Sequence, residues 1–309
     1  GAAALRAQIH ADWLQSHRRD PSFYQSNQAA GDVSMAPLSN KVALVTGASA
    51  PHGIGRAIAL KLAALGAIVV VTDQDGSVEI DATRHDRSAL LDDLVAQINT
   101  PDKPALGMTL DVTQASEIQH CVAQSVARFG RLDILVNNAG SLAGSKAFMS
   151  TTPQEWDTSF RVNLLGPMML AQAVIPQMIA QGGGRIINIG STGSLGAEPG
   201  FGAYTTMKHG LVGLSKTLAA EFGPNGILCN TVCPGYIETD MHMAANARLA
   251  REAALSIDAI KQQRYAPVAL RSAGLPIDVA NAVAFLAGPD ANYITGINLP
   301  VTGGVPFGI

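Results

Sequence analysis

Tyr204 and Lys208 stand four residues apart in the stretch "YTTMK", and on a helix this spacing places both side chains on one face. A phenol has a reference pKa of ~10 and is a poor base at neutral pH, but a nearby ammonium group stabilises its phenolate. Each unit of pKa lowering requires ~1.4 kcal/mol of differential interaction, which a partly buried lysine can supply. The pair therefore predicts a tyrosine that acts as a general acid and base.

Ser191 ends the apolar run "GRIINIGS", shortly before the tyrosine. A serine hydroxyl at this position can hydrogen-bond a substrate carbonyl oxygen as negative charge develops there. A tyrosine and a lysine with this spacing also occur on ordinary helices, so the pair by itself carries little weight. Its meaning depends on the elements that position it.

The stretch "VTGASAPHGIG" joins a predicted strand to a predicted helix through a glycine-rich loop. A helix N-terminus presents unpaired N–H groups and a positive dipole end, and glycines let a phosphate approach the backbone. Asp73 ends the next predicted strand about 20 residues after the glycines, where a carboxylate can bind an adenosine ribose. Because it would also repel a 2'-phosphate, the sequence predicts NAD, with NADP the less favoured cofactor. Arg56 could accommodate such a phosphate, but its place inside the predicted helix argues against that role.

Short apolar runs alternate with amphipathic stretches along the chain. Continuous apolar strands separated by helices predict a parallel sheet that helices cover on both faces. Such doubly wound α/β folds bind ligands at the carboxyl ends of their strands. The segment 116–129 is one of the predicted helices, because Ile118, Val122 and Val126 recur on one face. The predicted strands are 41–46, 67–73, 105–112, 132–140, 184–191, 226–235 and 296–304.

The composition is that of an ordinary globular protein, with 309 residues, a net charge of −3 and 47% hydrophobic residues. Lysines and arginines are scattered, so no nucleic-acid or anionic membrane surface is expected. No stretch approaches the ~18 uninterrupted apolar residues of a membrane span, and the N-terminal segment lacks a signal-peptide core, so a cytoplasmic location is predicted. Cys121, Cys229 and Cys233 are predicted to be core thiols, and no metal site is expected.

Two segments fall outside the alternating pattern. Residues 1–37 form a predicted extension whose apolar residues share one helical stripe before a polar linker, so it is either a docking helix or a frayed tail. Residues 38–309 form the predicted single α/β domain. Within it, the charged insert 74–89 is predicted to be a solvated loop.

Taken together, these motifs resemble the short-chain dehydrogenase/reductase family over about residues 39–305. The matching stretches are "TGASAPHGIG", "LDVT", "NNAG", "RVNLLG", Ser191, "YTTMK" and "PGYIET". The resemblance implies a Rossmann fold, a nicotinamide cofactor and a homotetramer. It also implies a catalytic tetrad of Asn163, Ser191, Tyr204 and Lys208. In that scheme Tyr204 exchanges the proton and Ser191 holds the substrate oxygen. Lys208 lowers the pKa of Tyr204 and binds the nicotinamide ribose, while Asn163 holds a water molecule of the proton relay.

The resemblance also implies which residues contact the cofactor. Residues 111–112 would contact its adenine, 138–140 would line the floor of the cofactor site, and 237–239 would lie near the nicotinamide amide. The implied cofactor-binding residues are Gly47, Ser49, His52, Gly53, Ile54, Gly55, Asp73, Asp111, Val112, Asn138, Ala139, Gly140, Tyr204, Lys208, Pro234, Gly235, Ile237 and Thr239. His52 is the ionisable group of the glycine loop. It reaches a phosphate when protonated, or it is an exposed loop residue without such a role.

The glycine loop departs from the main branch of the family. Pro51 and His52 look like a two-residue insertion, and the lengthened step from Gly47 to Gly53 resembles enoyl reductases of a divergent branch. Those enzymes have a longer spacing between tyrosine and lysine and lack the counterpart of Ser191. The sequence therefore favours an NAD(H)-dependent oxidoreductase that interconverts a secondary alcohol and a ketone. The alternatives are an enoyl-thioester reductase and a catalytically silent NAD-binding subunit.

The segment 240–274 follows "PGYIET" and is the predicted substrate lid. Its methionines suggest an adaptable apolar wall, and Arg248, Arg251 and Arg264 could meet a carboxylate or the phosphate of an acyl carrier. An amphipathic helix with a solvated basic face fits the same pattern. The predicted substrate is a small molecule, an apolar ketone or secondary alcohol, with a 3-oxoacyl or 3-hydroxyacyl thioester as one candidate.

Overall fold

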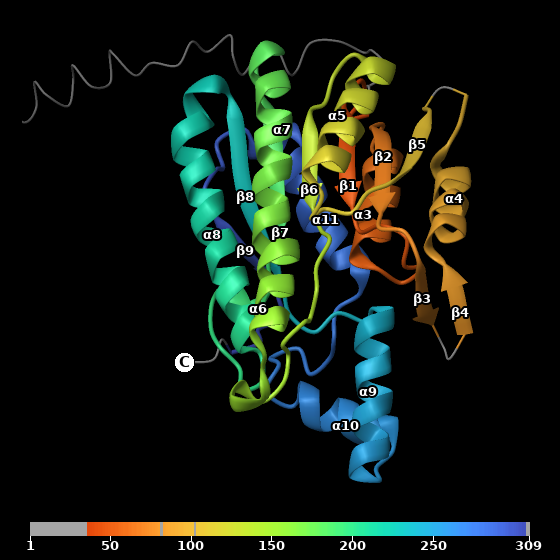
Figure 1. Cartoon of the computed structure of the whole chain (residues 1–309), viewed down its shortest axis with the longest axis vertical. Coiled ribbons are helices and arrows are strands. Elements are labelled where there is room, and N and C mark those ends of the chain that lie inside the picture. Colours follow the sequence, from red (N-terminus) through yellow and green to blue (C-terminus); the bar gives the residue numbers. More distant parts are fainter. Residues whose placement is uncertain (1–35, 81–82, 102, 307–309) are drawn as a thin grey trace, which may run out of the picture. The chain divides into compact units, whose positions relative to one another are not determined.

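The fold is seen in a computed structural model that describes residues 36–80, 83–101 and 103–306. Almost all of the predicted extension 1–37 lies outside the described residues, so the docking helix and the frayed tail both stay predictions. The centre of the domain is a seven-stranded sheet in the order β5-β2-β1-β6-β7-β8-β9. All of its strands are parallel, and helices lie on both faces (Figure 1). The prediction of a doubly wound parallel sheet is confirmed.

Each predicted strand forms, but several end earlier than their apolar runs. The predicted strand 132–140 stops at Asn137, because the next side chain, Asn138, turns its amide back to the carbonyl oxygens of Thr46 and Gly47, both at 2.8 Å. The strands of the sheet are β1 (Val42–Thr46), β2 (Ile68–Asp73), β5 (Ala105–Thr109), β6 (Ile134–Asn137), β7 (Gly184–Ile189), β8 (Ile227–Pro234) and β9 (Asn298–Val301).

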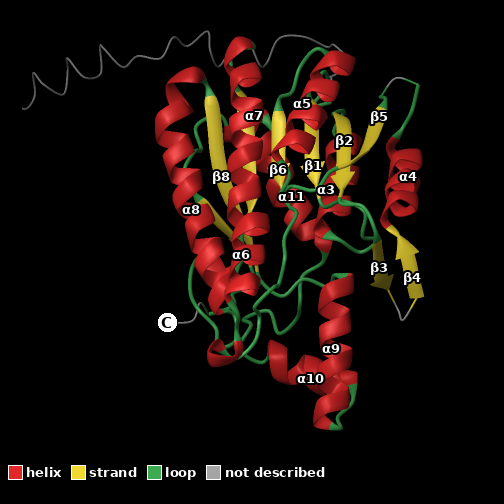
Figure 2. Cartoon of the chain, in the orientation of Figure 1, coloured by secondary structure: helices red, strands yellow, loops and turns green. Residues whose placement is uncertain are grey.

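Two helical layers bury the two faces of the sheet. Along β1, Ala43 and Val45 pack into one core, and Val42 and Leu44 pack into the other. Alternate residues of a strand point to opposite faces, so a continuous apolar run is what two buried faces require. Helices α5, α7 and α8 lie in front of the sheet in Figure 2. The first core includes α3 (Ile54–Ala64), α4 (Arg87–Ile98) and α11 (Pro276–Ala287), and the second includes α5 (Ala115–Phe129), α7 (Gly166–Ala180) and α8 (Gly202–Phe222).

Helix α6 (Pro153–Phe160) runs through a π-helical turn, Arg161–Leu165, directly into α7. Among the described helices, the combined run Pro153–Ala180 is the one long and apolar enough to cross a membrane, and 44% of its most apolar window is buried. Leu170, Val174 and Met178 from this run pack in the second core. Its apolar side therefore has a partner inside the domain, while the expected absence of a membrane span stays a prediction.

The prediction of a solvated loop over residues 74–89 is confirmed in its exposure to solvent and wrong in its lack of regular structure. This insert forms an antiparallel hairpin of β3 (Ser77–Ile80) and β4 (Thr83–Asp86), after which α4 begins. The signal was the alternation of Val78 and Ile80 with polar residues, since a period of two indicates a strand with one covered face. Ile80 is buried accordingly, although the charged neighbours dominate the composition of the segment.

The segment predicted to be the lid folds into α9 (Asp240–Ala253) and α10 (Ile257–Tyr265). Both helices lie beyond the carboxyl ends of the strands, outside the two layers (Figure 1). Among the described helices and strands, α9 makes extensive contact only with α10. Short 3-10 turns complete the described structure at Phe148–Ser150, Thr192–Ser194, Gly223–Asn225 and Pro289–Ala291.

Candidate active site

The predicted site residues gather at the edge of the sheet where the parallel strands end. Each of four strands contributes one of them, namely Gly47 after β1, Asp73 at the end of β2, Asn138 after β6 and Ser191 after β7. The strand order reverses between β1 and β6, and α/β sheets form their ligand crevice at such a reversal. The fold thus brings the glycine loop and the tyrosine cluster to one edge.

The glycine loop permits close approach to the backbone. Gly47 has a φ of +66°, and a Cβ there would lie 2.8 Å from the Cα of Ala139. A Cβ on Gly55 would lie 2.4 Å from the Gly47 carbonyl oxygen. Helix α3 begins after Gly53 with no side-chain cap and no acidic residue in its first turn, so its positive end is open to an anion. These features fit the pyrophosphate of a dinucleotide.

The two extra residues of the loop form a tight turn. The Gly53 N–H donates to the Ala50 carbonyl oxygen at 3.0 Å, which places Pro51 and His52 at the corner, and proline suits the first corner position. The ring Nδ1 of His52 lies 2.7 Å from Oδ1 of Asp240, at the start of α9, and the His52 backbone N–H donates to Oδ2 at 3.0 Å. The imidazole therefore contacts the predicted lid in this structure, and its role toward a phosphate stays a prediction.

The Asp73 carboxylate is buried at the end of β2, and both of its oxygens accept hydrogen bonds. Its Oδ2 accepts from the backbone N–H and the hydroxyl of Ser49, at 3.0 and 2.7 Å. Its Oδ1 accepts from the Gln74 N–H at 2.9 Å and from the Arg87 guanidinium at 3.0 Å. The sequence did not signal Arg87, because the hairpin separates it from Asp73. Arg87 Nε is buried and has no hydrogen-bond partner among the described residues, so a further acceptor would fit there.

The other predicted adenine and floor positions are fixed by local hydrogen bonds. The Asp111 carboxylate accepts from the Thr113 N–H at 2.9 Å, and the Asp111 N–H donates to Glu117 at 2.7 Å. Val112 is buried beside them. The Ala139 N–H donates to the Thr46 hydroxyl at 3.1 Å, which ties the floor to the end of β1. Asp111 and Ala139 are thus fixed by hydrogen bonds between backbone N–H groups and side-chain oxygens, at the same edge of the sheet as the glycine loop.

Ser191, Tyr204 and Lys208 form one cluster. The Ser191 hydroxyl and the Tyr204 ring lie on the same side of Gly193, where an added Cβ would be 3.6 Å from Ser191 Oγ and 3.7 Å from Tyr204 Cδ1. The Ser191 hydroxyl accepts from the Gly193 N–H at 3.1 Å. On α8, the Lys208 Nζ lies 5.6 Å from the centre of the Tyr204 ring, so the two side chains share a face as their spacing predicts. Lys208 Nζ also donates to the Ile189 carbonyl oxygen at 2.7 Å, which anchors it to the end of β7.

Burial sets the protonation of this cluster. It raises the pKa of Tyr204 above the ordinary value, and the Ser191 side chain lowers that pKa by a smaller amount. Burial also lowers the pKa of Lys208 to about 8. The prediction of a depressed Tyr204 pKa is therefore not met in this structure, because desolvation of the phenolate outweighs the groups that stabilise it.

Asn163 is fully buried in the π-helical turn between α6 and α7. Its side-chain oxygen accepts from the Ser141 N–H at 3.1 Å, and its amide donates to the Ser141 carbonyl oxygen at 2.9 Å and to the Ser159 hydroxyl at 3.2 Å. π-helical turns are rare and are often found at functional sites. Asn163 thus fixes the loop after β6, and its role in holding a relay water stays a prediction.

The chain between β8 and α9 carries the predicted nicotinamide positions. The N–H of Gly235, which follows Pro234 at the end of β8, donates to the Val301 carbonyl oxygen at 3.0 Å. Ile237 is buried and forms a β-bridge with Gly274. The Thr239 hydroxyl caps α9 by accepting from the His242 N–H at 3.2 Å. This segment therefore joins the sheet edge to the predicted lid.

All three cysteines are free and buried, which confirms the prediction of core thiols. Cys233 lies next to Gly190, where an added Cβ would be 3.1 Å from its Sγ. Burial raises the pKa of Cys233 to about 11, so the thiol is neutral near pH 7. In the part of the chain that the structure describes, no group of three or more potential metal ligands occurs.

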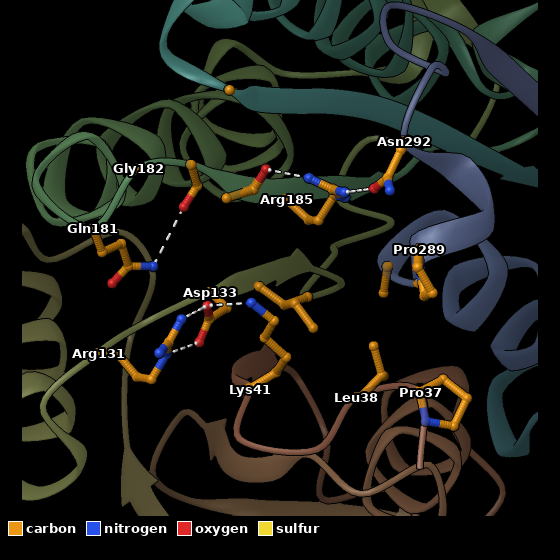
Figure 3. Close-up of a pocket in the computed structure, with 16 residues that line it drawn as sticks. Pro37, Leu38, Lys41, Arg131, Asp133, Gln181, Gly182, Arg185, Pro289 and Asn292 are labelled. Carbon is orange, nitrogen blue, oxygen red and sulfur yellow. Dashed lines mark hydrogen bonds and ion pairs between the residues drawn. The ribbon is translucent and has the colours of Figure 1, made fainter. Parts of the chain in front are cut away.

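A pocket of about 260 Å³ opens at the other end of the sheet, where the strands begin (Figure 3). Asp133 on its wall pairs with Lys41 at 3.2 Å and with Arg131 at 2.6 Å. Arg185, also on the wall, donates to Asn292 at 2.5 Å. No member of the tyrosine cluster lines this hollow. The chemistry therefore belongs to the opposite edge.

The comparison with known proteins agrees with this geometry. The family model described as enoyl-(acyl carrier protein) reductase matches residues 47–306. The 3-oxoacyl-(acyl-carrier-protein) reductase FabG of Staphylococcus epidermidis is 36% identical over 266 residues, which cover 86% of this chain and 99% of the relative. The chain belongs to the short-chain dehydrogenase/reductase family. As a member of this family it is an oxidoreductase with a nicotinamide cofactor.

Two further similar proteins are named as reductases. The short-chain reductase protein NovJ of Streptomyces niveus is 36% identical over 281 residues, which cover 91% of this chain and all of the relative (100%). The crystal structure of a variant actinorhodin polyketide ketoreductase with NADPH has a TM-score of 0.77 and 34% identity, and the match covers 86% of this chain and 97% of that one.

Proposed function

We propose that this chain interconverts a ketone and a secondary alcohol, with apolar ketones and 3-oxoacyl thioesters as its substrate classes. The observation that carries the proposal is that Ser191 and Tyr204 lie beside each other at Gly193, with Lys208 on the same helical face as Tyr204. A ketone oxygen needs a hydrogen bond and a proton as its carbon accepts a hydride. The Ser191 hydroxyl would supply the hydrogen bond and the Tyr204 hydroxyl would supply the proton, both to the same ketone oxygen.

Each residue of the cluster has a separate task. When bound, a nicotinamide would supply the hydride that adds to the carbonyl carbon. Ser191 donates a hydrogen bond to the carbonyl oxygen, and Tyr204 transfers its phenolic proton to that oxygen, so that C=O becomes CH–OH. Lys208 stabilises the phenolate left behind and would bind the nicotinamide ribose. The raised pKa keeps Tyr204 protonated near pH 7, which suits its role as the acid in ketone reduction.

Reduction of an enoyl thioester is the competing reaction, and the description of the matching family model names it. Enoyl reduction needs no second hydroxyl group beside the tyrosine, whereas Ser191 here lies beside Tyr204 at Gly193. The FabG relative is named for 3-oxoacyl reduction. A silent cofactor-binding subunit is the second alternative, and it leaves the clustered Ser191, Tyr204 and Lys208 without a purpose. Ketone chemistry uses all three.

We infer that NAD(H) is preferred over NADP(H) by a modest factor. Asp73 presents a carboxylate for the ribose and opposes a 2'-phosphate. Arg87 pairs with that carboxylate at 3.0 Å and offsets part of its charge, and a guanidinium is itself a phosphate ligand. Arg56 does not compete for this role, because it is buried and paired with Asp93. The residues present therefore fit either dinucleotide, with Asp73 favouring the unphosphorylated one.

The test is an assay of NADH and NADPH oxidation with acetoacetyl-CoA, a panel of ketones, and crotonyl-CoA as the enoyl substrate. Tyr204→Phe removes the proton donor and should lower kcat by about 10²- to 10⁴-fold while NADH still binds. Tyr293→Phe is the matched control, because Tyr293 is 91% exposed. Normal turnover by Tyr204→Phe, or oxidation of NADH with crotonyl-CoA and with no ketone, would contradict the proposal.

The homotetramer and the cytoplasmic location stay predictions. Met149 is 92% exposed and Leu270 is 73% exposed, but single exposed apolar residues are normal on a monomer, so the support for the tetramer is the family membership. Val305 near the C-terminus packs against Tyr265 and Val268 within its own domain, so this residue does not support an interface between subunits. Light scattering during size exclusion measures the mass, and a monomer at micromolar concentration would contradict the tetramer.

A further inference from the structure

The lengthened glycine loop contacts the predicted lid through one carboxylate. Both oxygens of Asp240 are engaged by His52, one by the ring Nδ1 at 2.7 Å and the other by the backbone N–H at 3.0 Å. The Asp240 side chain is 10% exposed, whereas the His52 ring is 59% exposed. A two-point contact fixes the orientation of the carboxylate as well as its distance. The contact joins segments that lie 188 residues apart in the chain.

Asp240 is placed for this contact by the way α9 begins. Thr239 caps the helix through its hydroxyl, so Asp240 occupies the first helical position. An acidic residue is stable there because it faces the positive end of the helix dipole. Its carboxylate thus points back toward the sheet edge, and a displacement of α9 would move it away from His52.

The insertion is what carries His52 to α9. Pro51 and His52 form the corner of a turn closed by the Gly53 N–H and the Ala50 carbonyl oxygen. A loop without these two residues would have no side chain at this corner. Gly53, the residue after the corner, is also the N-cap of α3, which would meet the pyrophosphate. One short turn therefore contacts both the dinucleotide position and the lid.

The two helices of the lid are joined by polar links, and Tyr265 of α10 also packs against Val268 and Val305. Helices α9 and α10 are held together by the His242 Nε2 contact with the Tyr265 hydroxyl at 2.8 Å and by the Asn246 amide, which donates to the same hydroxyl at 3.3 Å. Since α9 makes extensive contact only with α10 among the described elements, the two helices can shift together as a unit. The contact between His52 and Asp240 restrains that unit from the side of the cofactor loop.

We propose that His52 and Asp240 are a positioning pair that couples occupancy of the dinucleotide loop to the placement of the substrate lid. The proposal rests on the proposed function in one respect, which is that the loop binds a dinucleotide. A bound pyrophosphate orders the turn that carries His52, and the turn then holds Asp240 and α9 over the site. Coupling of this kind is reciprocal, so a placed lid also strengthens dinucleotide binding.

Hydrogen exchange on the full chain, with and without saturating NADH, measures the link independently of turnover. In the wild type, NADH should slow amide exchange both in 47–56 and in 240–253. Asp240→Asn keeps the size of the side chain and removes its charge, so it should retain protection of 47–56 and reduce the NADH-induced protection of 240–253 by about two- to fivefold. Arg248→Ala is the control on the same helix, since it removes only the exposed pair with Glu252, and it should respond as the wild type does.

A double-mutant cycle separates a direct contact from general loosening of the lid. His52→Ala and Asp240→Asn should be non-additive, because both weaken the same contact between the His52 ring and the Asp240 side chain. His52→Asn retains a side-chain N–H donor and should restore part of the protection. Additive effects, or wild-type protection of 240–253 in either single variant, would overturn the pair. If NADH protects no segment of the wild type, the proposed dinucleotide function fails together with the pair, whereas protection confined to 47–56 overturns the pair alone.

Discussion

The Arg87 guanidinium donates a 3.0 Å hydrogen bond to Oδ1 of Asp73, across the hairpin formed by the insert between β2 and α4. A carboxylate at the end of β2 favours the ribose of NAD, and a guanidinium beside it favours a 2'-phosphate. We therefore expect the coenzyme preference of this chain to depend on the balance between these two paired groups. Asp73 also accepts from Ser49, so loss of Arg87 would leave the carboxylate in place.

Arg87→Ala should sharpen the preference for NAD. Removing the guanidinium leaves the Asp73 charge without its ion pair, so the ratio of kcat/KM for NADH to that for NADPH should rise about tenfold. Asp73→Ala should reverse the preference or remove it. Arg84→Ala is the control from the same hairpin, where the exposed Arg84 donates to Ser77. Equal losses with both coenzymes in Arg87→Ala would show that the guanidinium only supports the fold.

Gly55→Ala should abolish dinucleotide binding at micromolar concentrations. An added Cβ would lie 2.4 Å from the Gly47 carbonyl oxygen, so either the loop or the start of α3 must move, at a cost of about 1–3 kcal/mol. Gly53→Ala is the graded comparison, because its Cβ would meet Ala50 at 3.0 Å and its φ is negative. Fluorescence titration with NADH and a thermal melt measure both variants. Wild-type affinity in Gly55→Ala would exclude a close approach of the dinucleotide at this point.

The elements that sequence could predict are those fixed by local patterns. The seven strands follow from continuous apolar runs, and the shared face of Tyr204 and Lys208 follows from helical spacing alone. Both depend on residues close in the chain, where periodicity is decisive. The hairpin has the same kind of signal in Val78 and Ile80, but the charged residues between them dominate the segment.

The features that sequence could not predict depend on contacts between distant segments or on burial. Arg87 meets Asp73, and His52 meets Asp240, only after the sheet has formed. The π-helical turn at Asn163 widens a helix without any distinctive residue type. The sign of the Tyr204 pKa shift is another case, because a sequence shows the neighbouring charge of Lys208 and does not show how far the phenol is removed from water.

The catalytic efficiency with NADH should fall as Lys208 loses its proton. Burial lowers the pKa of Lys208 to about 8, so the side chain is charged below that pH and becomes neutral above it. A neutral amine binds a ribose hydroxyl less strongly and does not stabilise the Tyr204 phenolate, so kcat/KM for NADH should fall as the pH rises above about 8. Lys208→Arg keeps its charge and should lack this step, at a lower overall rate. A flat wild-type profile between about pH 7 and 9.5 would contradict the prediction.

Acid should loosen the lid through His242. Its Nε2 lies 2.8 Å from the Tyr265 hydroxyl, and the two rings stack with their centres 6.0 Å apart. Burial, followed by the charge of Arg264, lowers the pKa of His242 to about 4, whereas the unfolded chain titrates near ~6.5. Between these two values the unfolded chain binds a proton that the folded chain does not. The free energy of unfolding should therefore fall as the pH drops from about 6.5 to 4, and this contribution should be constant above 6.5.

His242→Asn cannot bind that proton, so its stability should depend less steeply on pH across this window. We expect the difference in pH dependence to reach about 1 kcal/mol after solvent screening, which corresponds to roughly 2–4 °C in Tm for a domain of this size. Thermal melts at pH 7 and at about pH 5 measure it, and His209→Asn on the exposed face of α8 is the control. Hydrogen exchange at the lower pH should locate the loosening in 240–265. The same change in Tm for the wild type and His242→Asn would show that another group is responsible for the acid sensitivity.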